Sequence, residues 1–575
     1  MTNPSISELF VNEDSTIEFV MNKMNSAVNF NLPSGIVLVV DEFSKLLGVL
    51  TDGDIRRSLI AGIPLYSEIR NIYIKDPIVF SSELSYKEIL HKIPQKLLEK
   101  NRYKGNILEK IVIVNNDGYV INVFDFMQLW SQYSAKHRNI SVIGLGYVGL
   151  TLAVTLADVG FKVYGIEKNN SISESLKNGK PHFFEVGLEP MLKLHVNNNL
   201  EIVNSCPEIS DVFIVAVGTP LGNDFKPKLD DLQKAIEEIA QVLTFGNLII
   251  LRSTCPLGTC RNFVVPKLEE LSGLKCGKDF FVSFAPERTV EGKALQELKI
   301  IPQIIGGYDK NSQDLTTNIF SEFCPSIIPV ENLEIAEMAK LINNSFRDLK
   351  FAFVNELSLI CEQYNLDSNQ VVKAANQGYL RDPLPVPSPG VGGACLIKDP
   401  YIYSLSAKES ITEFSNLSLS ILGRKINESI PRNLFNKLNL EINRLNKKIN
   451  DVKIFLVGFA FKGEPETSDI RNSTTIDFLD ILKKYNYNIY GYDPVADKSD
   501  IENLGVKFVE YVEGFKNADC VCIMNNHRSY SNLDIFNLLE LTNKPSIYAD
   551  YWNIFPSFEI KKIEGIRYLG LSFSA

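Results

Sequence analysis

"NISVIGLGYVGLTLAVTLADVGFKVYGIEK", residues 139–168, is the stretch that decides the fold. It indicates a buried strand, a glycine-rich turn, a helix and a second strand that ends at Glu167. The spacing of Gly144, Gly146 and Gly149 in this β-α-β unit fits the dinucleotide fingerprint. The first two glycines allow a tight turn and the close approach of a pyrophosphate, and the third lets the helix pack on the strand. The stretch therefore predicts a dinucleotide-binding domain.

The cofactor that this stretch predicts is NAD. The helix opens at Tyr147 and Val148, so its N-terminus faces the phosphates with a partial positive charge. Glu167 can accept hydrogen bonds from both ribose hydroxyls, which favours NAD over NADP. NADP stays open because Lys168 follows directly, and a glycine turn that binds no ligand is a further alternative.

The alternation of strands and helices continues along the chain. Apolar strands with helical patterns between them are typical of a parallel, doubly wound sheet, and they recur at 211–220, 247–254 and 280–287. A second α/β unit begins at residue 452, without a tight glycine fingerprint. Residues 332–365 contain neither glycine nor proline and have a helical period. We expect them to form one long helix that joins the two α/β halves and supplies a dimer seam.

The N-terminal part of the chain contains a weak internal repeat. Residues 36–62 predict a strand, a turn, a short strand and a helix, and a looser copy follows before residue 130. Aligning Asp125 with Asp54 places Asn122 opposite Thr51. We therefore expect a separate module here, connected to the dinucleotide-binding domain by a short linker.

The length, cysteine content and net charge of the chain limit its domain number and its binding partners. A chain of 575 residues predicts two to four domains, and no apolar run has the length of a membrane span. Nine cysteines without metal-ligand spacing predict reduced thiols, a cytoplasmic setting and no metal site. The net charge of 59 − 69 = −10 disfavours nucleic acid and anionic membranes as partners. An anionic ligand must then be held by a local cluster of cations.

The stretch "GVGGACLIKD", residues 390–399, carries the candidate nucleophile. Glycines and charges surround Cys395, whereas a core thiol would lie in an apolar run. A free thiol has a pKa of about 8.5, and a nearby cation such as Lys398 favours the thiolate. A nicotinamide enzyme needs no nucleophile to oxidise an alcohol, but thiolate attack lets an aldehyde lose hydride and become a thioester. The combination predicts oxidation of an alcohol or aldehyde to an acid.

Other polar side chains lie at positions that suit a site. Lys340 and Asn344 are four residues apart and project from one face of the expected long helix. Glu287 and Glu291 follow the end of a strand, where open α/β sheets bind their ligands. Taken alone, Lys340 is better explained as a solvated helix lysine, and Glu287 and Glu291 as a surface acidic loop.

Seven motifs together resemble the UDP-glucose/GDP-mannose dehydrogenase family, and they cover residue 139 to about 570 in the right order: "GLGYVG", "VGTP", "STCPLGT", "APERTVEG", "KLINNSF", "GVGGACLIKD" and "GFAFKGEPETSDIRNS". The resemblance implies an α/β fold of two Rossmann-like doubly wound domains joined by a long central helix. It implies NAD as cofactor, a UDP-sugar as substrate and a homodimer or dimer-based oligomer. The implied reaction is the two-step oxidation of a sugar C6 hydroxyl to a uronic acid for polysaccharide synthesis.

The resemblance also divides the chain into parts and assigns roles. The implied parts are a CBS domain pair at 1–135, an NAD-binding domain at 139–330, a central helical dimerisation region with the cysteine loop at 331–430, and a UDP-sugar-binding domain at 450–575. Catalytic roles are implied for Cys395, Lys340, Asn344, Asp399, Glu287 and Thr219. Cofactor contacts are implied for Gly144, Gly146, Tyr147, Val148, Gly149, Glu167, Thr219, Lys398 and Arg471. Substrate contacts are implied for Glu287, Arg288, Lys340, Asn344, Phe461 and Lys462.

Within these roles, Cys395 is the nucleophile and Asn344 helps to hold the oxyanion. Lys340 and Asp399 handle protons and the hydrolytic water, and Glu287 is the base in thioester hydrolysis. These assignments rest on the resemblance alone. Arg252 departs from the family pattern, in which a glutamate is frequent at this position.

The sugar is indicated by two segments. Arg288 in "APERTVEG" resembles the form found in UDP-N-acetylhexosamine dehydrogenases, and "NNHRSY" (525–530) resembles their segment with departures at Asn526 and Tyr530. We expect a UDP-N-acetylhexosamine, with UDP-glucose or GDP-mannose as the alternative. A more remote alternative is a nucleotide-sensing regulator with an inactive dehydrogenase part.

The N-terminal repeat resembles a pair of CBS domains, an α+β module. In "GVLTDGDIRR", Thr51 and Asp54 match the positions that hold the ribose and phosphate of an adenine nucleotide. The second copy would be a degenerate site. A regulatory nucleotide is implied, and a structural or dimerising role for the module is the alternative.

Overall fold

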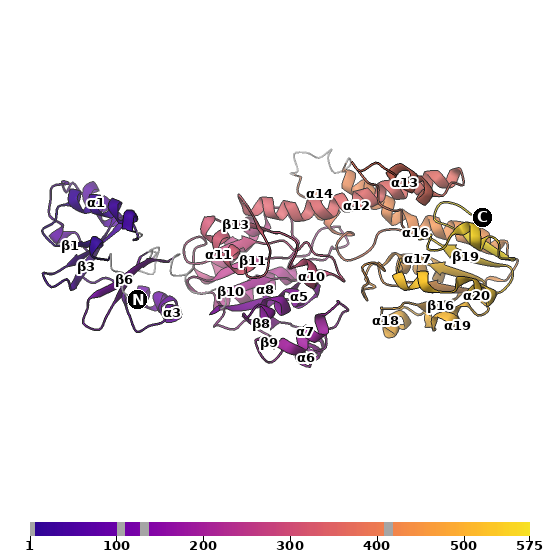
Figure 1. Cartoon of the computed structure of the whole chain (residues 1–575), viewed down its shortest axis with the longest axis horizontal. Helices are drawn as coiled ribbons and strands as arrows, with labels where there is room; N and C mark the ends of the chain where they lie inside the picture. The colour runs from indigo at the N-terminus through magenta and orange to yellow at the C-terminus, as the bar shows by residue number, and fades with distance from the viewer. Residues whose placement is uncertain are drawn as a thin grey trace.

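The computed structural model describes residues 6–30, 32–100, 108, 110–126, 137–407 and 418–574. Figure 1 shows an elongated molecule with an N-terminal module at one end and two α/β domains after it. Helices α12 (Leu333–Gln363) and α16 (Leu419–Asn443) extend from the middle domain to the C-terminal domain. The predicted fold class, two doubly wound domains joined by a long helix behind an N-terminal module, is confirmed.

Two small sheets of three strands form the N-terminal module. The first sheet contains β1 (Phe10–Val11), β2 (Ile36–Val40) and β3 (Leu46–Thr51), and the second contains β4 (Val79–Ser81), β5 (Lys110–Val114) and β6 (Val120–Asp125). In each sheet the first strand is parallel to the second, which forms an antiparallel hairpin with the third. The helices of the module are α1 (Ile17–Ser26), α2 (Asp52–Ile60) and α3 (Tyr86–Glu99).

The register of the two hairpins corrects the predicted repeat alignment. Ile36 pairs with Thr51 in the first hairpin, and Lys110 pairs with Asp125 in the second. Asp125 therefore corresponds to Thr51, so the alignment that placed Asn122 opposite Thr51 is wrong by three residues. The strand residues are apolar at most positions rather than at every second one, so the sequence pattern alone leaves the register open.

The middle domain is built on a sheet of eight strands in the order β14-β13-β12-β11-β10-β7-β8-β9. The strands are β7 (Asn139–Ile143), β8 (Lys162–Ile166), β9 (Leu200–Val203), β10 (Val212–Val215), β11 (Leu248–Leu251), β12 (Phe281–Phe284), β13 (Gln303–Gly307) and β14 (Ile327–Val330). β13 runs antiparallel to β12, and the six strands from β9 to β12 are parallel. Their order is that of dinucleotide-binding domains, with the crevice for the ligand where β7 and β10 diverge.

Helices cover this sheet because its strands are apolar on both faces. Every residue of β10, β11 and β12 is buried, as a parallel sheet between helical layers requires. The helices are α5 (Tyr147–Asp158), α6 (Asn170–Lys177), α7 (Leu188–His195), α8 (Asp230–Val242), α9 (Val265–Ser272), α10 (Ala294–Glu297) and α11 (Lys310–Phe320).

The C-terminal domain repeats the same topology. Its six parallel strands follow the order β17-β16-β15-β18-β19-β20, and they are β15 (Lys453–Val457), β16 (Asn488–Tyr492), β17 (Lys507–Phe508), β18 (Cys520–Ile523), β19 (Ser546–Asp550) and β20 (Ile566–Leu569). Its helices are α17 (Thr474–Leu482), α18 (Lys498–Asn503), α19 (Tyr511–Phe515), α20 (Ile535–Glu540) and α21 (Ser557–Ile560). The carboxyl ends of β15, β18 and β19 form the edge where ligands of such sheets bind.

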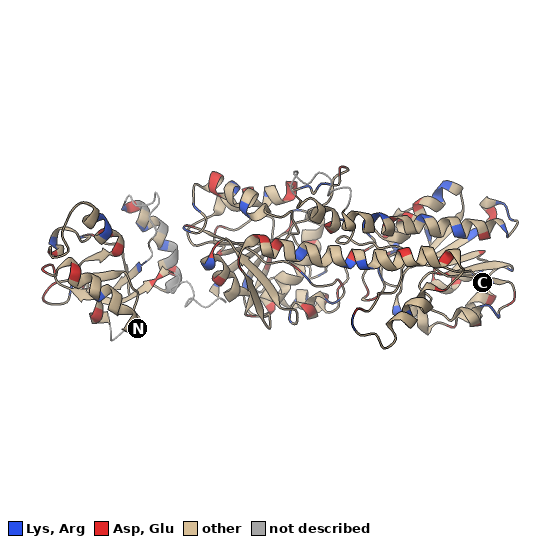
Figure 2. Ribbon diagram, turned by 90° about the horizontal axis from the view of Figure 1, so that it is seen from above, with Lys and Arg blue, Asp and Glu red and all other residues tan. Residues whose placement is uncertain are grey.

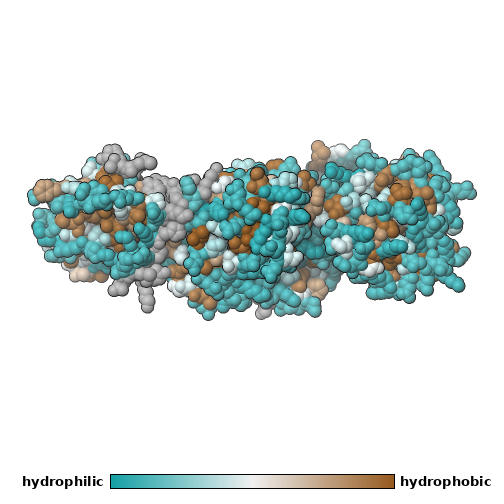
Figure 3. Space-filling view, turned by 90° about the horizontal axis from the view of Figure 1, so that it is seen from below, coloured by the Kyte–Doolittle hydropathy of each residue, from teal (hydrophilic) through white to brown (hydrophobic). Residues whose placement is uncertain are grey.

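Helix α12 spans 31 residues and packs along α16, as Figure 2 shows from above. Two shorter helices lie nearby, α13 (Ser368–Asn376) and α14 (Asp399–Ser404). Apolar side chains on the lower face of the molecule gather in small separate patches (Figure 3). Among the described residues, no helix has the length and apolar character of a membrane span.

The N-terminal module touches the middle domain through Phe126. Its ring lies edge-on to Phe245, with 5.1 Å between centroids, and stacks on Phe281 at 6.3 Å. Phe245 precedes β11 and Phe281 begins β12. The module thus contacts the amino-terminal edge of the sheet, opposite the edge at which the strands end and ligands bind.

Candidate active site

A different physical reason accounts for glycine at each of the three fingerprint positions. Gly144 adopts a φ of +88°, a left-handed turn that favours glycine. A Cβ on Gly149 would lie 1.8 Å from the Gly144 carbonyl oxygen, so only glycine lets α5 pack this closely. A Cβ on Gly146 would meet no described atom within 4 Å. The space beside Gly146 is where a pyrophosphate fits, at the N-terminus of α5.

Glu167 lies at the same turn. Its carboxylate accepts hydrogen bonds from the backbone N–H of Leu145 at 3.3 Å and of Asn169 at 2.8 Å. Lys168 points to other groups, since its ammonium donates to the Asn204 carbonyl and pairs with Glu238, both at 2.7 Å. Lys168 is therefore paired with Glu238, and the Glu167 carboxylate lines the first cavity, where it could accept from ribose hydroxyls.

Two cavities meet in the middle of the molecule. The first has a volume of about 710 Å³ and contains the glycine turn, Glu167, Thr219, Lys398 and Arg471 in its wall. The second, of about 310 Å³, lies between α12, the cysteine loop and the C-terminal domain. Both volumes suit small-molecule ligands. The residues that line both cavities are Thr289, Glu291, Lys340, Ala394 and Cys395.

Cys395 is thus reachable from both cavities, and it is the exposed member of the nine free cysteines. Protein atoms nevertheless surround the thiol closely. Burial and the Asp399 carboxylate raise the pKa of Cys395, and the ammonium groups of Lys340 and Lys398 oppose this rise without cancelling it. Lys398 therefore favours the thiolate, as expected from the sequence, but burial outweighs the nearby cations.

The cysteine loop is held by a buried arginine on α16. The Arg424 guanidinium donates to the carbonyls of Val391 at 2.8 Å and Leu396 at 3.3 Å, on both sides of Cys395. It also pairs with Asp348 of α12 at 2.7 Å. Burial raises the pKa of Asp348 to about 6 even though Arg424 lowers it. The loop that carries the thiol is thereby fixed to the α12–α16 pair.

Lys340 and Asn344 of α12 share one face of the helix, as their spacing predicts, and both line the second cavity. Lys340 is buried, and its ammonium donates to the Glu287 main-chain carbonyl. Asn344 donates its amide N–H to Asp399 at 2.6 Å. Asp399 is fully buried at the start of α14, one helical turn after Cys395, and it lies behind the cavities rather than in their walls. Asp399 therefore orients Asn344, whose side chain lines the second cavity.

Lys398 connects the cysteine loop to the middle domain. Its ammonium donates to the Thr219 hydroxyl at 3.2 Å and lies 3.5 Å from Asp399. The Thr219 hydroxyl in turn donates to the Thr254 carbonyl at 2.6 Å. Lys398 thus joins two walls of the first cavity.

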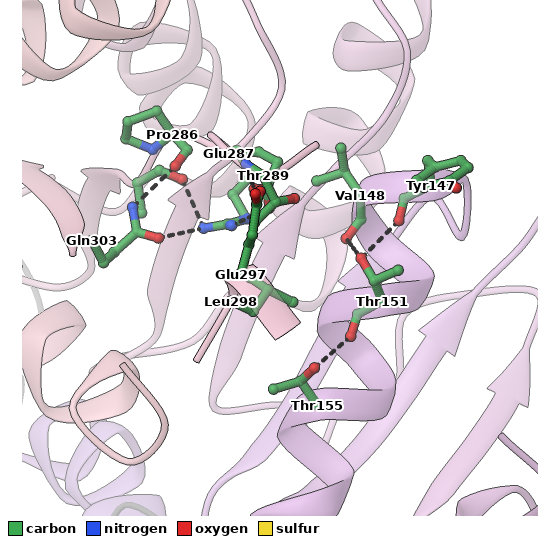
Figure 4. A network of polar contacts seen from close by, with 12 residues as sticks. Tyr147, Val148, Thr151, Thr155, Pro286, Glu287, Thr289, Glu297, Leu298 and Gln303 are labelled. Carbon is green, nitrogen blue, oxygen red and sulfur yellow. Dashed lines mark hydrogen bonds and ion pairs between the residues drawn. The ribbon is translucent and has the colours of Figure 1, made fainter. Parts of the chain in front are cut away.

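Glu287 is the most constrained carboxylate of the site. Arg252, at the end of β11, pairs with one of its oxygens, and the Thr289 N–H donates to the other at 2.6 Å. Burial alone raises the pKa of Glu287, but Arg252 and these hydrogen bonds outweigh it and hold the pKa below its ordinary value. Arg252 also donates to Gln303, which in Figure 4 is joined to Pro286 beside Glu287 and Thr289.

Glu291 contrasts with Glu287. Burial and the nearby Asp469 raise the pKa of Glu291 to about 7, against the effect of Lys462 and Arg471. One of its carboxylate oxygens is buried without a hydrogen-bond partner among the described residues. Lys462 donates to the Glu291 carbonyl at 2.6 Å, and Arg471 forms a two-pronged pair with Asp469.

The remaining predicted residues lie in separate places. Arg288 and Phe461 line the second cavity, and the Arg288 guanidinium donates to the Pro302 carbonyl. Thr51 and Asp54 line a third cavity of about 710 Å³ in the N-terminal module, far along the chain from the other two. There Asp54 accepts from the Thr51 hydroxyl at 2.6 Å and pairs with Arg57.

Comparison with known proteins shows which protein families this chain resembles. Models of the UDP-glucose/GDP-mannose dehydrogenase family match in three parts: the NAD binding domain at residues 138–324, the central domain at 334–429 and the UDP binding domain at 455–557. A CBS domain model matches residues 1–61.

Curated relatives cover about seven tenths of the chain. UDP-N-acetyl-D-mannosamine dehydrogenase of Pyrococcus horikoshii is 33% identical over 69% of this chain and 91% of the relative. The enzyme of that name from Campylobacter jejuni is 32% identical over 69% and 97%. Protein CapL of Staphylococcus aureus is 32% identical over 70% and 94%.

Solved structures match the same part. The UDP-D-ManNAc dehydrogenase from Pyrococcus horikoshii superposes with a TM-score of 0.68 at 30% identity, over 76% of this chain and 99% of the other. A UDP-glucose dehydrogenase from Pyrobaculum islandicum superposes with a TM-score of 0.65 at 26% identity, over 77% and 99%.

Proposed function

The chain belongs to the UDP-glucose/GDP-mannose dehydrogenase family and is an NAD-dependent nucleotide-sugar dehydrogenase, and we propose that Cys395 carries its oxidation of a sugar C6 hydroxyl to the acid. One observation supports this most directly. Cys395 lies where the cavity with the dinucleotide fingerprint meets the cavity of the C-terminal domain. A sugar held in the second cavity would place its C6 beside the thiol and within reach of the first.

The proposed first step removes a hydride from C6 and a proton from its hydroxyl, and the proton passes to solvent water. NAD, when bound, would supply the hydride acceptor, and a second NAD molecule would be needed for the second oxidation. The aldehyde carbon then forms a bond to the Cys395 sulfur, and the thiol proton ends on the former carbonyl oxygen. The Asn344 amide, held by Asp399, and the Lys340 ammonium are placed to stabilise charge on that oxygen.

The second oxidation leaves a thioester on Cys395, and water completes the reaction. The water oxygen forms a bond to the carbonyl carbon, the carbon–sulfur bond breaks, and the sulfur regains a proton as the carboxylate forms. A carboxylate must take the water proton, and Glu287 has this role in our proposal. Its ion pair with Arg252 keeps it ionised.

We propose a UDP-N-acetylhexosamine as the substrate. The support comes from the relatives, two of which are named UDP-N-acetyl-D-mannosamine dehydrogenase, and from Arg288 in the wall of the second cavity. UDP-glucose and GDP-mannose are the alternatives. The fold does not separate them, since the similar Pyrobaculum structure is a UDP-glucose dehydrogenase.

The test is a panel of UDP- and GDP-sugars assayed for NADH and for the acid product. We expect a UDP-N-acetylhexosamine to be turned over fastest, with two hydrides released per sugar. Cys395→Ser is expected to abolish acid formation, whereas Cys361→Ser, which changes a cysteine that lines neither cavity, should not. Acid formed at the normal rate by Cys395→Ser would overturn the proposal.

We also propose that α12 forms the seam of a homodimer. Apolar side chains that are 43% to 62% exposed recur on it at intervals of seven and four residues: Ile335, Ile342, Phe346, Phe353 and Ile360. Such a row on one helical face is typical of an interface between helices. Phe353→Glu is expected to yield monomers in sedimentation analysis, and an unchanged mass would contradict the seam.

We also propose a ligand for the cavity of the N-terminal module. The cavity around Thr51 and Asp54 is proposed to bind an adenine nucleotide, because it belongs to a CBS domain and has the volume of a nucleotide site. Nucleotide titration of the full chain, followed by NADH production, tests this.

The reaction is proposed to occur in the cytoplasm, since all nine cysteines are free, as in reducing compartments.

A further inference from the structure

An outer cleft lies between the middle domain and the C-terminal domain, apart from the cavities described above. It has a volume of about 750 Å³, and its walls include residues 180–187 of the middle domain and Glu466, Ser468 and Arg528 of the C-terminal domain. Among the described residues, it shares no wall residue with either of the two cavities that meet at Cys395. The proposed catalytic roles leave this cleft without a function.

Residues 182–185, here called the partition, separate the outer cleft from the first cavity. Tyr147, the first residue of α5, lines the first cavity, and its ring stacks on Phe183 of the partition with 4.2 Å between centroids. Burial lowers the pKa of His182, and the Glu167 carboxylate in the wall of the first cavity opposes this shift. Both His182 and Phe183 line the outer cleft. The partition therefore has the first cavity on one side and the outer cleft on the other.

The middle domain holds the partition through the Tyr147 hydroxyl. This hydroxyl is shared between the Phe184 carbonyl at 2.8 Å and the Glu185 carboxylate at 3.1 Å. The same oxygen of Glu185 accepts from the Gly292 N–H at 2.7 Å. Glu185 is buried, so these bonds are shielded from water. The partition is thereby tied to the helix that opens at the glycine fingerprint.

The C-terminal domain holds the partition at the same residue. Phe184 donates its backbone N–H to the Ser468 hydroxyl oxygen at 3.0 Å. Ser468 lies in the loop between β15 and α17, and both the carbonyl and the N–H of Phe184 are thus engaged, one by each domain. The Phe184 side chain is 37% exposed, and a hydrogen bond at the surface opens at a small free-energy cost. The bond to Ser468 is therefore the weaker of the two attachments.

The proposed reaction needs the dinucleotide to be exchanged while the sugar stays in place. The chain has a dinucleotide fingerprint in the middle domain and none in the C-terminal domain, so two oxidations use one site in succession. Between them the sugar carbon is bonded to Cys395. An exit through the outer cleft would leave the second cavity closed, because the described walls of the two are separate.

We propose that Phe184, held by Tyr147 and by Ser468, is the latch of a gate through which the spent dinucleotide leaves the first cavity for the outer cleft. This rests on the proposed function, because the two-step oxidation on Cys395 is what requires the exchange. Opening breaks the bond between Phe184 and Ser468, and the partition moves away from the C-terminal domain with the middle domain, to which Tyr147 attaches it. Ser468 lines the outer cleft and not the first cavity, so it acts on the dinucleotide through the partition.

The experiment measures how fast NADH leaves the full chain in the absence of sugar. The chain is loaded with NADH and mixed with excess NAD in a stopped-flow instrument, and the fall in NADH fluorescence gives the dissociation rate. Ser468→Ala is expected to raise this rate about 2- to 10-fold, the factor that corresponds to one lost hydrogen bond. Ser468→Thr keeps the hydroxyl and should restore the slow rate. Ser531→Ala is the matched control, since it removes an exposed hydroxyl that bonds within its own turn of the C-terminal domain.

A double-mutant cycle tests whether the two bonds act on one latch. Tyr147→Phe keeps the ring on Phe183 and removes the hydroxyl, so it should also speed dissociation. In Tyr147→Phe with Ser468→Ala the rate is expected to rise by less than the product of the two single effects, because both bonds hold Phe184. Effects that multiply exactly would show independent sites and refute the latch.

The outcomes separate this inference from the proposed function. An unchanged dissociation rate in a Ser468→Ala chain that melts at the normal temperature refutes the gate and leaves the proposed function intact. Acid formed at the normal rate by Cys395→Ser refutes the proposed function and removes the need for exchange on the enzyme. The dissociation rates are measured without sugar, so they decide the gate whichever way the second assay turns out.

Discussion

Replacing Arg252 by methionine tests how the buried ion pair controls Glu287. The Arg252 side chain is 1% exposed and that of Glu287 is 7% exposed. Arg252 also donates to the Ala285 carbonyl at 3.1 Å and to Gln303 at 3.0 Å. Methionine fills a similar volume and leaves a buried carboxylate without its partner. Breaking a buried pair in this way costs about 3–5 kcal/mol of unfolding free energy.

The effect depends on pH, with a sign that follows from the direction of the pKa shift. The pKa of Glu287 is below its ordinary value in the folded chain, so the pair stabilises the fold above that ordinary value and the stabilisation is lost as pH falls. Without Arg252, burial dominates and the pKa of Glu287 rises, although Lys340 still faces it. Arg288 and Cys324 are the other titratable neighbours. The stability difference between the two proteins should therefore shrink as pH falls.

Urea denaturation from pH 5 to 8 measures the stability difference, and the pH profile of turnover measures the base. We expect the acid limb of turnover to move to higher pH in Arg252→Met and to move less in Arg252→Lys. The double variant Arg252→Met with Glu287→Gln should regain much of the lost stability but remain inactive, because the unpaired charge is gone. A single variant with unchanged stability and an unchanged acid limb would refute the reasoning.

Two further predictions concern packing. Gly149→Ala forces a Cβ to within 1.8 Å of the Gly144 carbonyl oxygen and is expected to cost about 1–3 kcal/mol of unfolding free energy. Gly146→Ala should cost less stability and still weaken NAD binding. Thermal melts and NAD titrations check both variants, and equal stability losses would contradict the assigned roles. Phe126→Ala removes the ring that packs on Phe245 and Phe281 and is expected to destabilise this contact by about 3 kcal/mol, with basal turnover preserved. Limited proteolysis measures the contact, and an NADH assay measures turnover. A loss of turnover would contradict this prediction and show that the N-terminal module acts on the site.

The fold was predictable where local pattern determines it. The glycine fingerprint identified the middle domain because Gly144 and Gly149 answer local steric demands, and α12 lies within two residues of the predicted range at both ends. The register of the repeat was not predictable, since the strands of the N-terminal module are apolar at most positions. The strand pairing that aligns Thr51 with Asp125 is a tertiary property.

Arg424 and the contact between Lys398 and Thr219 were not predicted, and both join groups that are distant in sequence. Arg424 meets Asp348 from 76 residues away, and Lys398 meets Thr219 from 179 residues away. Spacing rules describe neighbours on one helix or strand, so they could identify Lys340 and Asn344 but not such contacts. The departure of Arg252 from the family pattern was the one signal in the sequence, and its meaning required Glu287 to be placed beside it.

The raised pKa of Cys395 bears on its proposed role as nucleophile. Burial and the Asp399 carboxylate favour the protonated thiol, so in the proposed mechanism attack on an aldehyde transfers the sulfur proton to the carbonyl oxygen. This proton transfer leaves the net charge of the site unchanged, so it needs no carboxylate as a base. It therefore suits a site in which Asp399 already accepts a hydrogen bond from Asn344 and Glu287 is already paired with Arg252. Release of the thioester is different, since water must lose a proton to a base. The two carboxylates of the first cavity are thus distinguished by their surroundings, since Arg252 holds the pKa of Glu287 below its ordinary value and burial raises the pKa of Glu291 to about 7.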